Sequence, residues 1–465
     1  MADPRGRRRR GGPRSGGRPP ARRPRVDPAR RAAFDVLRAV RVDDAYSNLV
    51  LPHALAEHGL TGRDAGFATE LAAGTLRRRG TYDAVLSACV DRPLAKVEAK
   101  VLDCLRLGTH QLLGMRVPAH AAISTTVDLV RDRAGQGPAG FANAVLRRVA
   151  EHDLGAWVRL VAPDPAADPR GFASIAHSHP RWVVDELARA LVGHGRSTDD
   201  LDALLAADNE APRVTLVARP GLATPAELEA AGAEPTGRSP YALTLPGGDP
   251  GQIPAVAQGR AGVQDEGSQR VALALTDAEL NGRDERWLDL CAGPGGKTAL
   301  LAAVAAQRGA RVTANEAQEH RARLVETSVR AAGAGMGTGE YGVVVGDGTA
   351  PAWAPGTFDR VLVDAPCSGL GALRRRAESR WRRRPADVTE LVGLQRALLD
   401  SALDLVRPGG VVVYATCSPV LAETSEVVSA VLAGRDAAVE ESRFQLWPDT
   451  DGSDAMFAAT LRRVE

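Results

Sequence analysis

The first large segment of the chain, residues 27–151, has apolar residues spaced as on amphipathic helices. The period is plainest over 32–40 and 101–107, and no part of the segment alternates in the manner of a strand. Asp27-Pro28 and Ser124 have side chains suited to helix starts. The pattern therefore predicts an all-α domain of five to seven helices around one core.

The pattern changes after residue 151. Prolines among aspartates and alanines predict a linker over 152–168. Beyond the linker, a helical segment at 179–187 and strand-like segments at 213–218 and 241–245 follow one another. We therefore expect residues 170–285 to form a small α/β domain.

From residue 286 to residue 465, strand and helix signals alternate. Such alternation indicates a parallel sheet with helices on both faces, so we predict a Rossmann-like α/β domain. Two last strands, near 443–447 and 456–462, are expected to form an antiparallel edge. The predicted strands of the parallel part are 286–291, 310–315, 341–346, 358–364 and 410–416, and the predicted helices are 296–308, 317–333 and 387–406.

The net charge of +2 conceals an uneven distribution of arginines. Residues 1–26 are rich in Arg, Gly and Pro with almost no large apolar side chain, so we predict a disordered basic arm there. A second basic run, residues 374–384, includes Trp381. Because arginines bind phosphates and aromatic rings stack on bases, both segments favour a nucleic-acid partner.

The five cysteines stand at positions 89, 104, 291, 367 and 417. Their odd number, wide spacing and lack of a Cys-x-x-Cys pair argue against a disulfide framework and a structural metal site, and favour a reducing cytoplasm. No apolar run is long enough to span a membrane, and the arginine-rich start is not a secretory signal. Cys89 and Cys104 fit apolar helix faces and are predicted to be buried packing residues.

A glycine-rich turn follows the first strand of the last domain, in Leu288-Asp-Leu-Cys-Ala-Gly-Pro-Gly-Gly-Lys-Thr298. A P-loop would need glycine at position 291, where the chain has Cys291, and the spacing also departs from the dinucleotide fingerprint. An adenosyl cofactor fits better, because the helix that begins near residue 296 offers free N–H groups to a carboxylate. Glu316 and Asp347 end the next two strands, where carboxylates can accept from ribose hydroxyls and an adenine amino group.

Cys367 and Cys417 each stand where a strand ends, in Asp364-Ala-Pro-Cys-Ser-Gly369 and Thr416-Cys-Ser418. With a methyl donor in the neighbouring pocket, a thiolate that adds to C6 of cytosine makes C5 nucleophilic enough to take the methyl group. Asp364 could hydrogen-bond the ring N3 and exocyclic amine. These residues alone leave open which thiol attacks, and buried packing residues are the alternative interpretation.

In combination, three motifs resemble those of the RNA cytosine-C5 methyltransferases, and most closely the bacterial 16S ribosomal RNA group of the RsmB, Sun and Fmu type. The motifs are Cys-Ala-Gly-Pro-Gly-Gly-Lys-Thr298, Asp-Ala-Pro-Cys-Ser-Gly369 and Tyr-Ala-Thr-Cys-Ser-Pro419. The helical domain, residues 27–151, resembles the NusB-like domain of that group in Ala45-Tyr-Ser-Asn-Leu49, Phe67-Ala-Thr-Glu-Leu71 and Gly140-Phe-Ala-Asn-Ala-Val-Leu-Arg-Arg148. The resemblance covers nearly the whole chain after the basic arm.

The resemblance implies S-adenosylmethionine as methyl donor and a class I methyltransferase fold for residues 286–465. It implies Cys417 as nucleophile and Cys367 as the residue that assists product release, whereas the DNA-type arrangement would make Cys367 the nucleophile. Gly293 and Glu316 depart mildly from the Ala and Asp that the family often has. The implied donor contacts are Cys291, Ala292, Gly293, Pro294, Gly295, Gly296, Lys297, Glu316, Asp347 and Asp364.

The resemblance also implies 16S ribosomal RNA as partner, either as naked RNA or within an assembling small subunit. We expect a cytoplasmic monomer without metal, DNA or membrane partners, in which the helical domain docks RNA. Two other functions remain open: the same chemistry on transfer RNA or another ribosomal RNA site, and a non-catalytic RNA-binding or antitermination factor.

Overall fold

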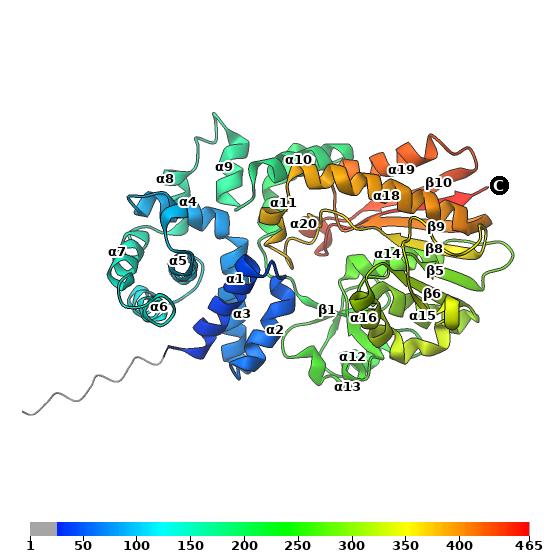
Figure 1. Ribbon diagram of the computed structural model, residues 1–465, viewed down its shortest axis with the longest axis horizontal. Coiled ribbons are helices and arrows are strands. Elements are labelled where there is room, and N and C mark those ends of the chain that lie inside the picture. The colour runs from blue at the N-terminus through cyan, green and yellow to red at the C-terminus, as the bar shows by residue number, and fades with distance from the viewer. Residues whose placement is uncertain (1–25, 465) are drawn as a thin grey trace, which may run out of the picture.

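The structure, a computed structural model, describes residues 26–464. The predicted basic arm lies outside this range except for Val26, which is buried against the first helices. Figure 1 shows a helical lobe built from the N-terminal part of the chain beside a larger lobe that contains the main sheet. None of the helices within residues 26–464 is long and apolar enough to cross a bilayer.

The helical lobe confirms the prediction of an all-α region. Its buried side chains form one apolar core that includes Cys89 and Cys104, as predicted. Asp27 caps the first helix by accepting the N–H of Ala29 at 3.1 Å. The seven helices are α1 (Pro28–Val42), α2 (Ser47–Glu57), α3 (Gly62–Arg77), α4 (Arg79–Cys89), α5 (Ala99–Leu113), α6 (Ala119–Ala134) and α7 (Ala139–Val149).

Two local predictions in this part of the chain are wrong. Ser124 does not begin a helix, because it lies inside α6. Its hydroxyl donates to the carbonyl of Ala121 in the preceding turn at 3.2 Å. The predicted linker contains α8 (Leu154–Val161), which is held by the buried Trp157, whose Nε1 donates to the carbonyl of Val149 at 2.8 Å. The apolar face of this short helix outweighs the prolines that follow it.

Three further helices join the lobes. Side chains of α10 and α11 share an apolar cluster with residues of the last domain, among them Leu370 and Trp447. This packing fixes the helices against the sheet lobe rather than leaving them as a flexible connection. The helices are α9 (Pro169–Ala176), α10 (Arg181–Gly193) and α11 (Leu201–Ala207).

A small antiparallel sheet follows, with the order β2-β3-β1-β4. Two of its strands, β1 and β3, were predicted, whereas β2 and β4 are too short to leave a periodic signal. The strands are β1 (Val214–Ala218), β2 (Glu234–Pro235), β3 (Ala242–Leu245) and β4 (Ala261–Val263), and the helices around them are α12 (Pro225–Glu229), α13 (Pro254–Ala257) and α14 (Glu266–Asp277).

The main sheet has seven strands in the order β10-β11-β9-β8-β5-β6-β7. The strands β9, β8, β5, β6 and β7 are mutually parallel, whereas β11 and β10 pair antiparallel at one edge, as predicted. The strands are β5 (Arg286–Asp289), β6 (Arg311–Glu316), β7 (Val343–Val345), β8 (Phe358–Asp364), β9 (Val406–Thr416), β10 (Ala438–Gln445) and β11 (Phe457–Arg463). The helices are α15 (Gly296–Arg308), α16 (Glu319–Val329), α17 (Ser379–Arg382), α18 (Pro385–Leu405), α19 (Ser425–Leu432) and α20 (Pro448–Asp451).

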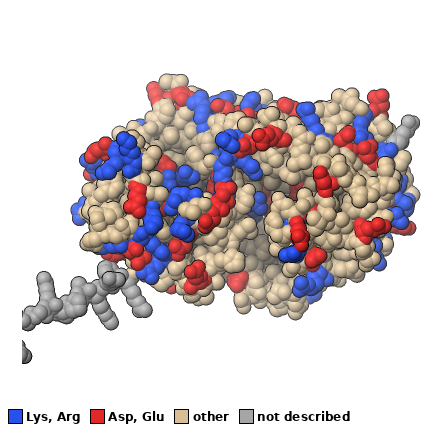
Figure 2. Space-filling model, viewed as in Figure 1, with Lys and Arg blue, Asp and Glu red and all other residues tan. Residues whose placement is uncertain are grey.

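This topology determines where the predicted site residues lie. Parallel strands present their carboxyl ends at one edge of the sheet, and ligands of open α/β sheets bind there. The five parallel strands therefore bring the loops after β9, β8, β5, β6 and β7 side by side in that order. Figure 2 shows positive and negative side chains intermixed on one face of the molecule, with a hollow between the two lobes.

Candidate active site

The turn between β5 and α15 depends on two glycines. Gly293 and Gly295 have φ values of +56° and +92°, which are in the left-handed region. A Cβ on Gly295 would also lie 2.8 Å from the Cα of Val325 in α16. The backbone turn is therefore closely packed against α16, and the first N–H groups of α15 point out at the carboxyl edge of the sheet.

Glu316 holds this turn from the end of β6. Its side chain is buried, and its Oε2 accepts the N–H of Gly293 at 3.0 Å. Its Oε1 accepts the N–H of Gln318 at 3.1 Å. Each carboxylate oxygen has a second lone pair, so both can accept a further bond from a ligand hydroxyl.

Asp347 follows β7, the next strand along the sheet edge, and is exposed. Its Oδ1 accepts the backbone N–H of Thr349 at 2.9 Å and the Thr349 hydroxyl at 2.8 Å. These two bonds hold the pKa of Asp347 below its usual value, so that its carboxyl group is ionised. Its other oxygen faces solvent and is available to a donor.

Two polar contacts, one fully and one partly buried, lie beside the glycine-rich turn. Asp289 accepts the Thr298 hydroxyl at 2.7 Å through Oδ2, its Oδ1 has no partner among the described residues, and burial raises the pKa of Asp289 to about 7. Lys297 donates from Nζ to Oδ2 of Asp364 at 2.7 Å. Burial opposes the lysine charge, but the Asp364 carboxylate outweighs it and raises the pKa of Lys297. The ammonium group is therefore charged at neutral pH.

Cys367 and Cys417 meet at the ends of β8 and β9. Their Sγ atoms are 3.4 Å apart, and both residues are partly exposed. The two loops are also joined through the backbone, because the N–H of Gly371 donates to the carbonyl of Cys417 at 2.9 Å. A Cβ on Gly371 would lie 2.1 Å from the carbonyl oxygen of Ala455, so glycine there lets the loops approach this closely.

Charges around the pair distinguish its two thiols. The hydrogen bond from Cys367 lowers the pKa of Cys417, and the nearby cations Arg376 and Lys297 lower it further, although burial and the Asp364 carboxylate oppose ionisation. The same hydrogen bond raises the pKa of Cys367, and burial and the Glu423 carboxylate raise it further. The arrangement therefore favours a Cys417 thiolate that accepts a hydrogen bond from the Cys367 thiol.

Glu423 connects the loop that carries Cys367 to the loop that carries Cys417. It is fully buried, and its Oε1 accepts the backbone N–H of Ser368 at 2.7 Å. Its Oε2 accepts the hydroxyls of Ser368 at 2.5 Å and of Ser418 at 2.7 Å. Gln395 donates both to Glu423, at 3.2 Å, and to the carbonyl of Pro366, at 2.9 Å. Because each serine directly follows a site cysteine, this carboxylate fixes the positions of the two loops relative to each other.

Most arginines of the basic run 374–384 point inward. The prediction that this run forms a phosphate-binding surface is therefore wrong for most of its length. Arg375 donates to Asp265 at 2.7 Å and to Asp454 at 3.2 Å, and Arg374 pairs with Asp454 at 3.4 Å. Arg380 is fully buried and donates to backbone carbonyls of the connecting helices. These guanidinium groups already have protein acceptors, so they stabilise the packing of the lobes.

Trp381 does not form the predicted stacking platform. A Cβ on Gly80 of α4 would lie 2.3 Å from its ring, which means that the helical lobe packs against the indole and leaves the residue only partly exposed. The guanidinium of Arg79 lies 5.9 Å from the centroid of the same ring. Trp381 is therefore an apolar contact between the lobes.

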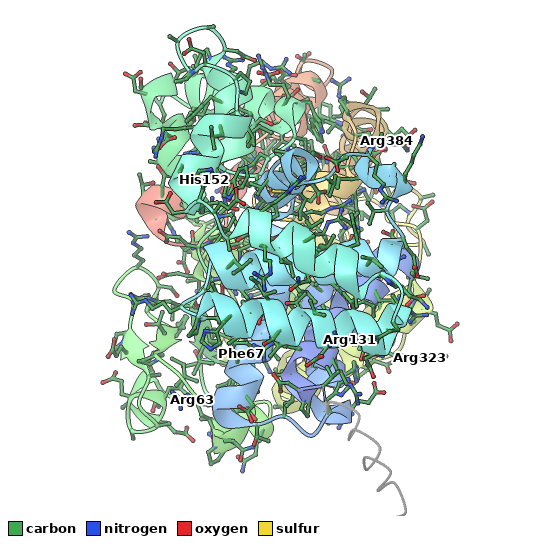
Figure 3. All side chains as sticks on the ribbon, turned by 90° about the vertical axis from the view of Figure 1, so that its left-hand side faces the viewer. Arg63, Phe67, Arg131, His152, Arg323 and Arg384 are labelled. Carbon is green, nitrogen blue, oxygen red and sulfur yellow. The ribbon has the colours of Figure 1, made fainter. Side chains whose placement is uncertain are left out.

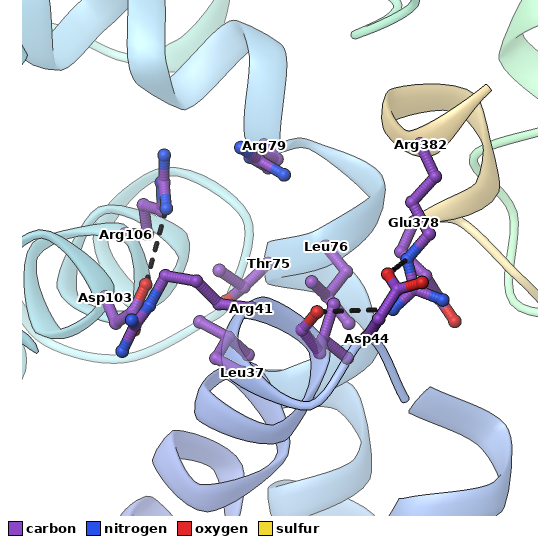
Figure 4. Close-up of a pocket in the computed structure, with 11 residues that line it drawn as sticks. Leu37, Arg41, Asp44, Thr75, Leu76, Arg79, Asp103, Arg106, Glu378 and Arg382 are labelled. Carbon is purple, nitrogen blue, oxygen red and sulfur yellow. Dashed lines mark hydrogen bonds and ion pairs between the residues drawn. The ribbon is translucent and has the colours of Figure 1, made fainter. Parts of the chain in front are cut away.

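The same segment docks the motif 45–49 of the helical lobe. Glu378 is buried and accepts the backbone N–H and the hydroxyl of Ser47, each at 2.8 Å. Arg382 donates to the carbonyl of Ala45 and pairs with Asp44 at 2.9 Å. Figure 4 shows Arg382 and Asp44 at this junction, beside a cavity of about 230 Å³ that is lined by charged side chains of both lobes.

Sequence reasoning missed three residues of the site. Glu423 ends a short 3-10 helix, and its contact with Ser368, 55 positions away, joins it to the other thiol loop, so no local pattern marks it. Asp289 was part of the quoted glycine-rich motif, but its burial could not be deduced. Arg376 was not distinguished from the other arginines of its run. Among residues 26–464, no group of three or more His, Cys, Asp or Glu side chains could hold a metal ion.

Comparisons with known proteins place this chain in a family. Residues 278–462 match the model of the 16S rRNA methyltransferase RsmB/F family, and residues 27–151 match that of the NusB family. A putative methyltransferase of Mycobacterium tuberculosis is 53% identical over 97% of this chain and 99% of its own length. The ribosomal RNA small subunit methyltransferase B of Xylella fastidiosa is 35% identical over 86% of this chain and 92% of its own length.

Solved structures support the fold. PH0851 superposes with a TM-score of 0.75 at 21% identity, and the match covers 95% of this chain and 100% of PH0851. NSun6 from Pyrococcus horikoshii, solved with SFG, has a TM-score of 0.50 at 16% identity over 60% of this chain and 98% of its own length. The Mycobacterium tuberculosis and Xylella fastidiosa relatives span both lobes, and both are named as methyltransferases. This argues against the interpretation of the chain as a non-catalytic RNA-binding factor. The chain belongs to the RsmB/F family of 16S ribosomal RNA methyltransferases that use S-adenosylmethionine.

Proposed function

We propose that the protein transfers a methyl group to C5 of a cytosine in 16S ribosomal RNA through a covalent adduct between Cys417 and C6. The observation that carries the proposal is the pair of thiols at 3.4 Å, one of which is favoured as a thiolate and the other as a thiol. A binding module needs neither of these two thiols, and nor does a methyltransferase that acts on an amine. We further expect the protein to act as a cytoplasmic monomer on RNA, naked or within an assembling small subunit.

The residues at the ends of β5, β6 and β7 fit the methyl donor. The glycine-rich turn, 291–297, lacks long side chains at Gly293 and Gly295, and the buried Oδ1 of Asp289 has no partner within the described chain. Glu316 would accept the ribose hydroxyls, and Asp347 would accept the adenine amino group. The N–H groups that open α15 would bind the donor carboxylate. When bound, the donor supplies an electrophilic methyl group.

The reaction begins with the pyrimidine. The Cys417 thiolate attacks C6, a C–S bond forms, and the ring electrons become available at C5. Asp364 keeps Oδ1 free while Lys297 occupies Oδ2, so Asp364 can accept a hydrogen bond from the exocyclic amine and orient the ring. Because C5 then carries enamine character, it could form a bond to the electrophilic methyl group that the bound donor would supply, with the donor's S–CH3 electron pair remaining on its sulfur.

Product release reverses the addition. A base takes the C5 proton, the electron pair re-forms the C5–C6 double bond, and the C–S bond breaks with Cys417 as the thiolate leaving group. Cys367, hydrogen-bonded to Cys417, assists this step. The target cytosine must be unpaired or flipped to reach the thiols, because a stacked base cannot enter the site.

A tritium-release assay tests this chemistry. Unmodified 16S RNA that carries tritium at cytosine C5 would be incubated with the protein and S-adenosylmethionine. We expect one tritium released per methyl group gained, because methylation at C5 replaces that hydrogen. Methyl incorporation with full retention of tritium would contradict the proposal, and preferential methylation of transfer RNA would show that the chemistry acts on a different substrate.

A further inference from the structure

One arginine of the basic run 374–384 differs from all the others. Within the described residues, Arg376 is the only one of them whose guanidinium has no hydrogen bond or ion pair to a protein acceptor, and it is exposed. Exposed arginines are common, but most of the other arginines of this segment are engaged in interior contacts. No carboxylate of the described residues therefore fixes its side chain.

An aromatic ring from the other lobe holds Arg376. The guanidinium lies 5.1 Å from the ring centroid of Tyr46, and Arg382 lies 5.0 Å from the same centroid. Tyr46 in turn is fixed because its neighbour Ser47 donates twice to the buried Glu378. Cation–π contact orients a guanidinium without using its N–H donors, so Arg376 keeps them for an external acceptor.

The position of Arg376 indicates which acceptor this is. The segment that carries Arg376 is joined to the Cys417 loop, because the N–H of Gly371 donates to the carbonyl of Cys417 at 2.9 Å and the N–H of Arg376 donates to the carbonyl of Ala372, the next residue, at 3.0 Å. Arg376 therefore lies at the mouth of the reaction centre, where its charge also lowers the pKa of Cys417. An extruded nucleotide carries a phosphate on each side of its ribose, and these phosphates stay at the mouth while the base enters the site. Arginine presents paired N–H donors that match two phosphate oxygens.

We propose that Arg376, held in place by Tyr46, binds a phosphate that flanks the target cytosine, so that the helical lobe completes the substrate site. This inference rests on the proposed function, since it requires an RNA base in the thiol site. The helical lobe then contributes to catalysis through the position of Tyr46 as well as by docking RNA elsewhere. Ordering the guanidinium before RNA arrives lowers the entropic cost of binding it.

Arg376→Ala tests the phosphate contact, and Arg384→Ala is the matched control. Arg384 belongs to the same run and is 80% exposed, but its one partner is Asp387 at 3.5 Å, and Figure 3 shows it at the rim of the molecule. The full chain would be titrated with unmodified 16S RNA over a range of salt concentrations. Removing one phosphate contact should weaken binding about 10-fold and lower the slope of log affinity against log salt by about 0.7 to 0.9.

Three further measurements separate this contact from other effects. Arg376→Lys should restore the salt slope, because it keeps the charge. Tyr46→Ala should weaken RNA binding whereas Tyr46→Phe should not, because the ring alone holds the guanidinium. The affinity for S-adenosylmethionine should be the same in all variants.

An unchanged slope in Arg376→Ala, or an equal loss of RNA affinity in Arg384→Ala, would overturn the inference. Tritium release by the wild-type protein in the same experiment would show that the proposed function stands when this inference fails.

Discussion

The helical lobe and the main sheet each contain a pair of cysteines, and the two pairs have opposite surroundings and opposite chemistry. Cys89 and Cys104 lie in an apolar core, where burial raises the pKa of Cys89 to about 11 and the pKa of Cys104 further. Cys367 and Cys417 are partly exposed, and the pKa of Cys417 is lowered by the Cys367 thiol and by two cations, against the opposing effects of burial and Asp364. Burial alone makes a thiol inert, whereas a hydrogen-bond donor and neighbouring cations make one reactive.

The substitution Cys417→Ala should have the largest effect. It removes the proposed nucleophile, so methyl transfer to 16S RNA should fall by more than about 10³-fold, the scale expected for loss of a covalent catalyst. Methyl incorporation from labelled S-adenosylmethionine measures this. The control is Cys89→Ala, which removes a thiol of the inert pair and should keep wild-type activity. Equal losses in both variants would break the comparison between the two pairs.

The next largest effect is expected from Glu423→Gln. The amide keeps the size of the side chain but removes the negative charge and one acceptor for the serine hydroxyls. We expect the methylation rate to fall about 10-fold, the scale of one lost charge-assisted hydrogen bond. Because the lost anion had raised the pKa of Cys367, that pKa should fall, and its alkylation should begin at a lower pH than in the wild type. Wild-type rates and an unchanged pH profile would remove Glu423 from the site.

The two pairs should also differ in their pH dependence. Since the pKa of Cys417 is lowered, its thiolate fraction and its rate of alkylation by iodoacetamide should rise with pH at lower pH values than for an ordinary cysteine. Cys89 and Cys104, with raised pKa values, should remain unlabelled in the folded protein at pH 8. Mass spectrometry of the labelled peptides measures all three residues in one sample. Labelling of Cys104 before Cys417 would contradict the assignment.

The smallest effect on function is expected from Cys104→Ser. The hydroxyl would be buried without a defined partner, which costs about 1–3 kcal/mol of stability. Thermal unfolding should register this loss, while the rate of methyl transfer at a temperature well below unfolding should be unchanged. A loss of activity greater than the loss of folded protein would show that Cys104 takes part in the reaction, contrary to its interpretation as a packing residue.

The parts of the structure that could be predicted from the sequence depend on neighbouring residues. Strand and helix periods predicted the five parallel strands, and the glycine-rich turn was recognisable because its glycines permit an unusual backbone. Contacts between distant residues could not be predicted in this way. Arg375 is paired with Asp265, which is 110 positions away, and with Asp454, which is 79 positions away. Because such partners leave no local signal, the run 374–384 looked like a free basic surface. Glu423 was missed for the same reason, since its partner Ser368 is 55 positions distant.

The central claim is that Cys417 forms the bond to C6 and Cys367 acts later, in product release. Incubating Cys367→Ala with 16S RNA and S-adenosylmethionine and running the products on a denaturing gel tests this most directly. Without Cys367 the adduct still forms but elimination stalls, so we predict a protein–RNA complex that survives denaturant. Cys417→Ala and the double variant should show none. A trapped complex in Cys417→Ala, with none in Cys367→Ala, would contradict the account and would mean that the two thiols have the opposite roles.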